Sequence, residues 1–226
     1  MKLFKKTLTK LIAMAAVMVL MCVGIAAQAE VWDLADDFSI ENGNPNGAWS
    51  YGWAPTDFSA FYLEPNSSYT AFGGSPIWYG VASIWKNTTT VDADFVPVGW
   101  VALHPGEGEQ PSIARWTAPA EVSGSATVAG QFLPGDGGHM QVAVIKNGSQ
   151  IWQAGDAGTF NLVTDVSPGD TVDFAVYGGY YSGSTPLDAT INTTVPEPSG
   201  LALLSGAAGL CGFALRRRKI KEVKKI

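Results

Sequence analysis

The sequence predicts an all-β domain, an antiparallel β-sandwich of the jelly-roll kind, flanked by an N-terminal signal helix and a C-terminal apolar helix. Three observations predict this fold. Short runs rich in β-branched and aromatic residues recur along the middle of the chain, and many of them alternate between apolar and polar residues. Turn-forming residues separate the runs, and almost no helical periodicity appears between the two apolar ends.

Ten runs fit strands, and they cover residues 48–53, 58–63, 77–85, 96–103, 112–117, 126–132, 140–146, 160–166, 171–177 and 187–193. In the run 171–177, Val172, Phe174 and Val176 fall on one face, and Asp173 falls on the other. Asn147-Gly148 predicts a hairpin turn, and Ser167-Pro168-Gly169-Asp170 predicts a second turn. No repeat with a period of 20 to 50 residues is present, which argues against solenoids and propellers.

The N-terminal segment 1–29 has the organisation of a secretory signal peptide. Four lysines precede an apolar run from Leu11 to Ala27, and Ala27-Gln28-Ala29 places small residues where a signal peptidase needs them. We therefore expect an exported domain over residues 30–194. The two cysteines, Cys22 and Cys211, lie in the terminal apolar runs, so a disulfide, a Cys-ligated zinc and a thiol nucleophile are excluded from this domain.

Charge is distributed unevenly along the chain. The whole chain carries −6, but the segment Glu30 to Pro198 has nineteen acids against three bases, Lys86, Arg115 and Lys146, a net charge of −16. Such an acidic surface argues against a nucleic-acid partner, because phosphate binding needs clustered lysines and arginines. It suits a domain that stays soluble outside the cell.

The C-terminal segment 195–226 has the organisation of a membrane-sorting tail. Pro196, Glu197 and Pro198 form a stiff spacer before an uncharged run from Leu201 to Leu215, which we expect to be a transmembrane helix. At ~1.5 Å per residue this helix is about 22 Å long, short for a hydrocarbon core of about 30 Å. A basic cluster follows the helix and is expected to remain cytoplasmic; it comprises Arg216, Arg217, Arg218 and Lys219.

The Pro-Glu-Pro motif, short apolar helix and basic cluster, in this order at a C-terminus, resemble the PEP-CTERM sorting signal, also known as the ice-binding-protein C-terminal domain. The resemblance covers about Val195 to Lys219. It implies recognition and processing by exosortase, an integral membrane protease, in bacteria that make exopolysaccharide and biofilm. Pro196, Glu197 and Pro198 would then be the recognised residues.

The middle of the chain also resembles a β-sandwich module of exported planctomycete-type proteins, over nearly the whole of Asp36 to Ile191. The residues that carry the resemblance are Asp37-Phe38-Ser39, the run from Asn44 to Trp53, His104-Pro105-Gly106, Arg115-Trp116-Thr117-Ala118-Pro119 and the run from Pro168 to Phe174. The resemblance implies a sandwich of the carbohydrate-binding type and implies no particular ligand.

All eight tryptophans lie in the expected exported domain, and tryptophan and tyrosine faces stack on sugar rings. The alternation of Trp49, Tyr51 and Trp53 predicts that all three point to one side of a strand, and Trp78 points away from its neighbour Tyr79. Trp49, Tyr51, Trp53 and Trp78 are therefore the candidate carbohydrate-binding residues. The alternative is that these rings fill the sandwich core.

The remaining candidates for chemistry are acids and histidines. Asp36-Asp37 and the pair Asp92 and Asp94 leave a structural calcium ion open, but neither matches a full calcium-loop spacing, and solvated turn acids are the alternative. The histidines are His104 and His139, both in Gly/Pro-rich surroundings, and no nucleophile-elbow motif is present. No catalytic residue and no cofactor is predicted.

The sequence therefore predicts an exported, exosortase-sorted, non-enzymatic protein of the cell surface or extracellular matrix that associates with exopolysaccharide. Its expected partners are exosortase, the membrane and a polysaccharide. Two alternatives stay open. One is an exported hydrolase acting on glycans or esters. The other is an ice-binding protein, for which Thr88-Thr89-Thr90 is an isolated run and not a ladder.

Overall fold

The computed structural model of the 226-residue chain describes residues 29–135, 139–180 and 183–194. These residues belong to one compact unit, Ala29–Val195. The signal peptide with its helix, the Pro-Glu-Pro motif, the apolar helix over 201–215 and the basic cluster all fall outside the described residues. Within the described residues, no helix is long and apolar enough to cross a membrane.

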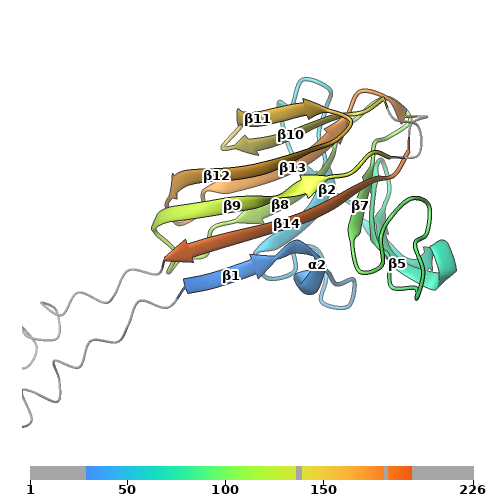
Figure 1. Ribbon diagram of the computed structural model, residues 1–226, viewed down its shortest axis with the longest axis horizontal. Coiled ribbons are helices and arrows are strands. Elements are labelled where there is room, and N and C mark those ends of the chain that lie inside the picture. The colour runs from blue at the N-terminus through green and yellow to red at the C-terminus, as the bar shows by residue number, and fades with distance from the viewer. Residues whose placement is uncertain (1–28, 136–138, 181–182, 195–226) are drawn as a thin grey trace, which may run out of the picture. The chain divides into compact units, whose positions relative to one another are not determined.

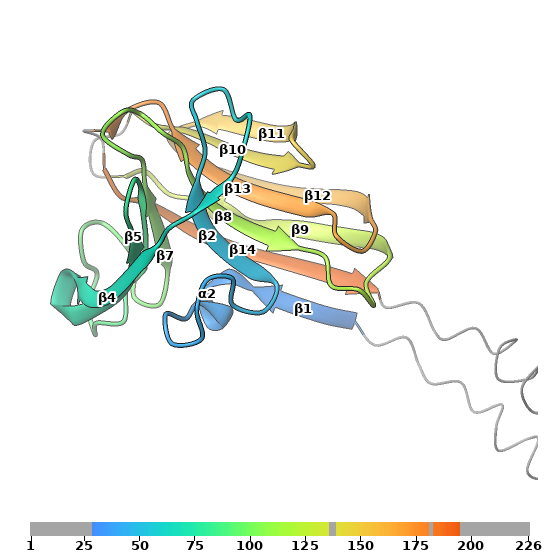
Figure 2. The same cartoon turned by 180° about the vertical axis from the view of Figure 1, so that it is seen from behind.

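The described unit consists of two antiparallel sheets (Figures 1 and 2). Sheet A contains, in spatial order, β12 (Gly158–Val166), β9 (Gly124–Phe132), β14 (Thr185–Thr194), β7 (Val101–His104), β6 (Ser83–Lys86), β5 (Ser75–Tyr79) and β4 (Asn66–Ala71), and β1 (Ala29–Asp33) pairs with β14. Sheet B contains β11 (Ser149–Gly155), β10 (Gln141–Lys146), β13 (Thr171–Tyr177), β8 (Ser112–Thr117), β2 (Trp49–Trp53) and β3 (Tyr62–Leu63). The short helices α2 (Leu34–Asp37) and η1 (Phe72–Gly74) follow β1 and β4. The predicted two-sheet antiparallel sandwich is confirmed.

The main core lies between the two sheets and is built from alternate residues of their strands. On β13 the predicted alternation is confirmed, because Val172, Phe174 and Val176 are all buried in this core. Sheet A contributes the facing side chains, among them Val128, Phe132, Phe160, Leu187 and Ile191. Large rings of this core contact one another, because Trp32 packs edge-on against Trp116, and Trp49 lies against Phe174.

Most predicted strands are present, with corrected ends. The predicted run 77–85 is a hairpin of β5 and β6, and only Tyr62 and Leu63 of the run 58–63 pair as a strand. Strands β1, β4 and β11 were not predicted. The Asn147-Gly148 turn is confirmed as the β10–β11 connection, with φ of 48° and 76° at its two residues. The Ser167–Asp170 turn is also confirmed by the hydrogen bond from the Asp170 N–H to the Ser167 carbonyl.

The two ends of the described domain leave it side by side. Ala29 is paired with Thr194 where β1 runs antiparallel to the end of β14 (Figure 1). The other end of β14 is Thr185, which pairs with Leu103 of β7. At about 3.3 Å per residue, roughly 30 Å of strand separates Thr185 from Thr194. The sandwich therefore has an end where the chain enters and leaves, and a far end that carries β7 and the loops beyond it.

Candidate functional site

Three of the four predicted carbohydrate-binding residues are core residues. Trp49, Tyr51 and Trp78 are all at most 4% exposed. The Trp49 indole N–H donates to Asp37 Oδ2 at 3.0 Å, and the Trp78 indole N–H donates to the Ser39 carbonyl at 3.0 Å. A ring that is covered on both faces has none left for a sugar. The prediction that these three residues bind carbohydrate is therefore wrong, and the core alternative holds for them.

The fourth predicted residue, Trp53, lies at the surface. Trp53 is the last residue of β2 and is only partly buried. Its ring stacks on the ring of Tyr62, with centroids 4.8 Å apart and planes inclined by 29°. Tyr62 is 49% exposed, so the stacked pair presents an aromatic surface to solvent. We call Trp53 and Tyr62 the aromatic shelf.

The fold places the aromatic shelf at the edge of sheet B. Trp53 and Tyr62 are directly opposite each other in the antiparallel β2–β3 pair, so their side chains share one face. Gly52 makes this close pairing feasible. A Cβ atom at Gly52 would lie 2.2 Å from the Tyr62 carbonyl oxygen and 2.7 Å from the Phe61 ring. Strand β3 has no further partner in the described sheet B, which leaves the shelf at an open edge.

A buried carboxylate anchors the surroundings of the shelf. Glu64 follows β3, is almost fully buried, and accepts the N–H groups of Val81 and Ala82 at 3.1 and 2.7 Å. These bonds tie the β5–β6 turn to the end of β3 next to Tyr62. Burial raises the pKa of Glu64, although the two N–H donors act in the opposite direction. The Asn44 amide donates to the carbonyls of Tyr51 and Glu64 and fixes the same corner.

The loop 105–111 lies beyond Trp53. The Ala54 N–H donates to the Pro111 carbonyl at 3.1 Å, and Trp53 is paired with Ser112 at the end of this loop. Gly106 packs against Val81, because a Cβ atom there would lie 2.6 Å from the Val81 carbonyl oxygen. Glu107 and Glu109 are exposed on this loop. The shelf, the β5–β6 turn and the loop 105–111 therefore lie together at the far end of the sandwich.

The predicted acidic pairs have other roles in the structure. Asp37 accepts the Trp49 indole, as described above, and the Asp92 side chain accepts the Val98 N–H at 3.2 Å. Asp94 occupies a tight turn at φ 51°. Among the described residues, no group of three or more His, Cys, Asp or Glu side chains has a metal-binding arrangement. Asp37 and Asp92 thus accept hydrogen bonds within the domain, and Asp94 forms part of a turn.

The two histidines are in separate settings. His104 Nδ1 lies 2.8 Å from the Pro105 carbonyl oxygen, and the ring packs edge-on against Tyr180 at 5.2 Å. Because a carbonyl can only accept, Nδ1 is the donor in that contact. His139 is exposed before β10. Thr88, Thr89 and Thr90 lie in the loop between β6 and β7, where Thr89 donates to Asn87 and Val91 rather than forming part of a strand.

An exposed aromatic shelf at an open sheet edge can stack on the C–H face of a sugar ring. Sequence reasoning predicted Trp53 and did not predict Tyr62. The signal for Tyr62 was its place in the predicted run 58–63, but the register that puts it opposite Trp53 depends on Gly52 and on a loop of eight residues between the strands. Alternation alone could not show which ring of the series Trp49, Tyr51 and Trp53 reaches the surface.

No protein-family model and no curated protein matches the chain. Solved structures with some similarity include a family 35 carbohydrate-binding module from Cellvibrio japonicus, with a TM-score of 0.36, 10% identity, and coverage of 75% of this chain and 95% of that one. Another is a family 35 carbohydrate-binding module from Clostridium thermocellum, with a TM-score of 0.33, 16% identity, and coverage of 51% and 89%. These TM-scores are below 0.5, and the strand pairing of the chain itself establishes the two-sheet fold.

Proposed function

We propose that residues 29–195 form a non-enzymatic, glycan-binding domain of an exported protein of the cell surface or extracellular matrix. The observation that supports this most directly is the aromatic shelf of Trp53 and Tyr62, which is open to solvent at a sheet edge. The acidic character of the domain and the signal-peptide pattern before it support export.

The position of the shelf suits a tethered protein. The chain enters and leaves the domain at Ala29 and Thr194, and the sorting tail would follow directly. The shelf lies at the far end, because Trp53 pairs with Ser112, and the Ser112 hydroxyl donates to the Ser83 carbonyl beside His104. Within the described domain, the shelf is therefore at the opposite end from Ala29 and Thr194.

Affinity electrophoresis of residues 29–195 tests the proposal, since this unit has its own closed core. Gels would contain one of a panel of polysaccharides, such as dextran, galactomannan or hydroxyethyl cellulose. We expect at least one to retard the domain, and Tyr62→Ala to weaken that binding about tenfold, equal to ~1.4 kcal/mol. Tyr62→Phe keeps the ring and should keep most of the retardation.

The matched control is Tyr69→Ala, which removes another exposed tyrosine from β4 in sheet A. It should bind like the unaltered domain. Retardation that Tyr62→Ala and Tyr69→Ala reduce equally would show that the shelf is not the site. No retardation by any polysaccharide would count against the function itself.

Sorting by exosortase remains part of the proposal and has its own test. If the tail is processed near Pro196-Glu197-Pro198, mass spectrometry of the mature protein should find a C-terminus that lacks Arg216 to Lys219. An intact basic cluster on the exported protein would refute processing without affecting the shelf.

A further inference from the structure

All three cations of the described domain are engaged within the domain. Lys86 Nζ donates to the Ala35 carbonyl at 2.6 Å. Arg115 forms a bidentate ion pair with Asp173, in which Nε donates to Oδ1 at 2.6 Å and Nη2 donates to Oδ2 at 2.8 Å. Lys146 Nζ lies 3.4 Å from Asp170 Oδ2. Among residues 29–135, 139–180 and 183–194, every lysine and arginine therefore already has an internal partner.

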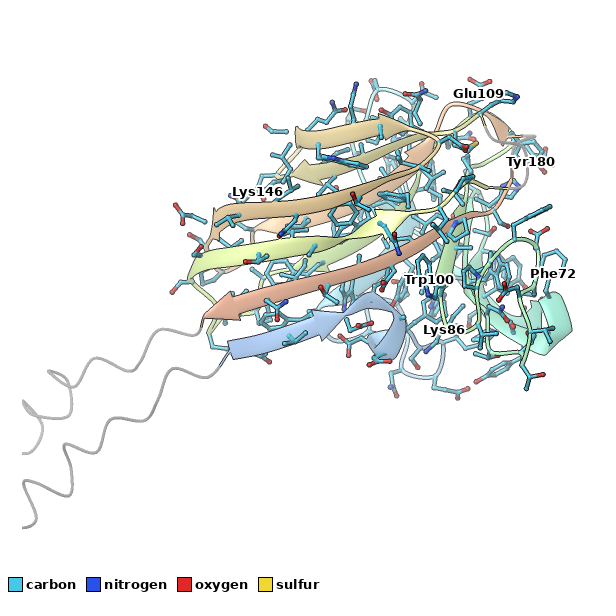
Figure 3. The ribbon with its side chains drawn as sticks, viewed as in Figure 1. Phe72, Lys86, Trp100, Glu109, Lys146 and Tyr180 are labelled. Carbon is cyan, nitrogen blue, oxygen red and sulfur yellow. The ribbon has the colours of Figure 1, made fainter. Side chains whose placement is uncertain are left out.

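These cations also point away from the aromatic shelf, although Arg115 lies against the ring of Phe61, the residue before Tyr62. Arg115 alternates with Ala114 and Trp116, which face the main core, so it points to the face of sheet B opposite the side that Trp49, Tyr51 and Trp53 share. Lys146 lies at the β10–β11 turn, and Lys86 lies at the end of β6 against α2 (Figure 3). None of the three is placed to meet a ligand on the shelf.

The charged side chains of the loops that adjoin the shelf are acidic. Asp57 is exposed on the loop that joins Trp53 to Tyr62, and Glu107 and Glu109 are exposed on the loop beyond Trp53. Glu109 is labelled in Figure 3 at the end of the sandwich that also holds Tyr180. The Debye length at physiological salt is about 8 Å, so fixed acids act on a ligand bound beside them.

We infer that the aromatic shelf takes the rings of a neutral polysaccharide, one without carboxylate or sulfate groups. This inference rests on the proposed function and narrows its ligand class. An anionic sugar on the shelf would lose part of its hydration beside three acids and would find no free cation to compensate the loss. A neutral sugar needs only an aromatic face and hydrogen-bonding partners, and its binding is insensitive to salt.

Affinity electrophoresis with chemically matched polymers tests the ligand class. The probes are hydroxyethyl cellulose against carboxymethyl cellulose, and dextran against dextran sulfate, each in 20 and 300 mM NaCl. We expect a neutral polymer to bind at least tenfold more tightly than its anionic counterpart in low salt, with neutral binding unchanged in high salt. Tyr62→Ala should weaken the neutral binding.

Charge reversal beside the shelf gives a second readout. The double variant Glu107→Lys with Glu109→Lys should increase retardation by carboxymethyl cellulose in low salt, and adding Tyr62→Ala should reduce it again. Asp165→Lys with Glu121→Lys makes the same change in net charge on exposed residues elsewhere and should have a smaller effect. Equal effects of the two double variants would overturn the inference, because the local acids would then not select the ligand.

The failure of the inference can be told apart from the failure of the proposed function. If an anionic polymer binds more tightly, loses binding in high salt and depends on Tyr62, the glycan-binding function stands and the neutral ligand class falls. If none of these polymers retards the domain, the function and the ligand class fall together. If the polymers retard the domain and Tyr62→Ala leaves all retardation unchanged, the domain binds glycans elsewhere and the inference about the shelf falls alone.

Discussion

The outer faces of the two sheets differ in what covers them. On sheet A, the outer side chains of β12, β9 and β14 form a mostly polar surface without a lysine or arginine. It includes Thr127, Gln131, Asn161, Asp165, Asp188, Thr190 and Asn192, together with the apolar Val163. On sheet B, the loop between β2 and β3 lies over the outer face. Phe58 and Phe61 of this loop pack on a second apolar cluster of Ala54, Ile113, Ala143, Ile145 and Ala175.

The two sheets show that apolar–polar alternation along a strand identifies the core face but does not show whether the opposite face is exposed to solvent. Val163 on β12, an edge strand of sheet A, is 74% exposed on the open face. Asp173 on β13 also alternates with core residues, yet it is only 4% exposed, because it lies under the covered face and pairs with Arg115. The Arg115 guanidinium in turn lies 4.0 Å from the centre of the Phe61 ring. An acid in an alternating strand can thus be a surface group or part of a buried ion pair.

Loss of the buried acid should reduce stability far more than loss of the exposed acid. Asp173→Ala leaves the guanidinium of Arg115, 25% exposed at its side chain, without its partner. We expect the free energy of unfolding to fall by about 3 kcal/mol. Asp165→Ala, on the open face of β12, should change it by less than about 0.5 kcal/mol. Urea unfolding of the domain measures both values.

A double variant sharpens this first prediction. Asp173→Ala combined with Arg115→Met removes the unpaired charge and should recover part of the lost stability. If Asp173→Ala lowers the free energy of unfolding no more than Asp165→Ala does, then the β2–β3 loop does not shield the Arg115–Asp173 pair from solvent. The two outer faces would then not differ in energy.

The covered face also marks where sequence reasoning reaches its limit. The core residues of β13 and the turn at Asn147-Gly148 follow from period and turn chemistry, which are local properties. Trp49 and Trp53 occupy equivalent positions in the same alternation. Trp53 reaches solvent because it is paired with Tyr62 of β3 and lies at the end of the sandwich, and neither property is local. Strand β4 was missed because Asn66–Ala71 is polar and exposed on an edge, so no apolar pattern marks it.

A smaller effect is expected from the ring that covers Arg115. Phe61→Leu keeps an apolar side chain on the second cluster but removes the π-face above the guanidinium. A cation–π contact at a partly exposed site is worth about 1 kcal/mol, so the free energy of unfolding should fall by that amount. Val163→Ala on the open face serves as the control and should be nearly neutral. Equal losses in the two variants would show that Phe61 contributes only general apolar contact.

The smallest effect concerns an acid at the margin of the open face. Burial, and in second place the charge of Asp33, raises the pKa of Asp188. A carboxyl group with a raised pKa in the folded state contributes stability below its unfolded pKa of about 3.9, and that contribution is lost as the pH rises through the folded pKa. Asp188→Asn cannot ionise. It should therefore raise the melting temperature at pH 7, by no more than about 2 °C, and leave it unchanged at pH 3.

Asp165→Asn controls for the loss of one negative charge from an acidic domain. It should raise the melting temperature at pH 7 by less than Asp188→Asn does. Circular dichroism at the two pH values measures both variants. A lower melting temperature of Asp188→Asn at pH 7 would mean that the folded domain gains stability from the ionised carboxylate. The pKa of Asp188 would then be lowered in the folded state, opposite to the direction that its burial and the charge of Asp33 give.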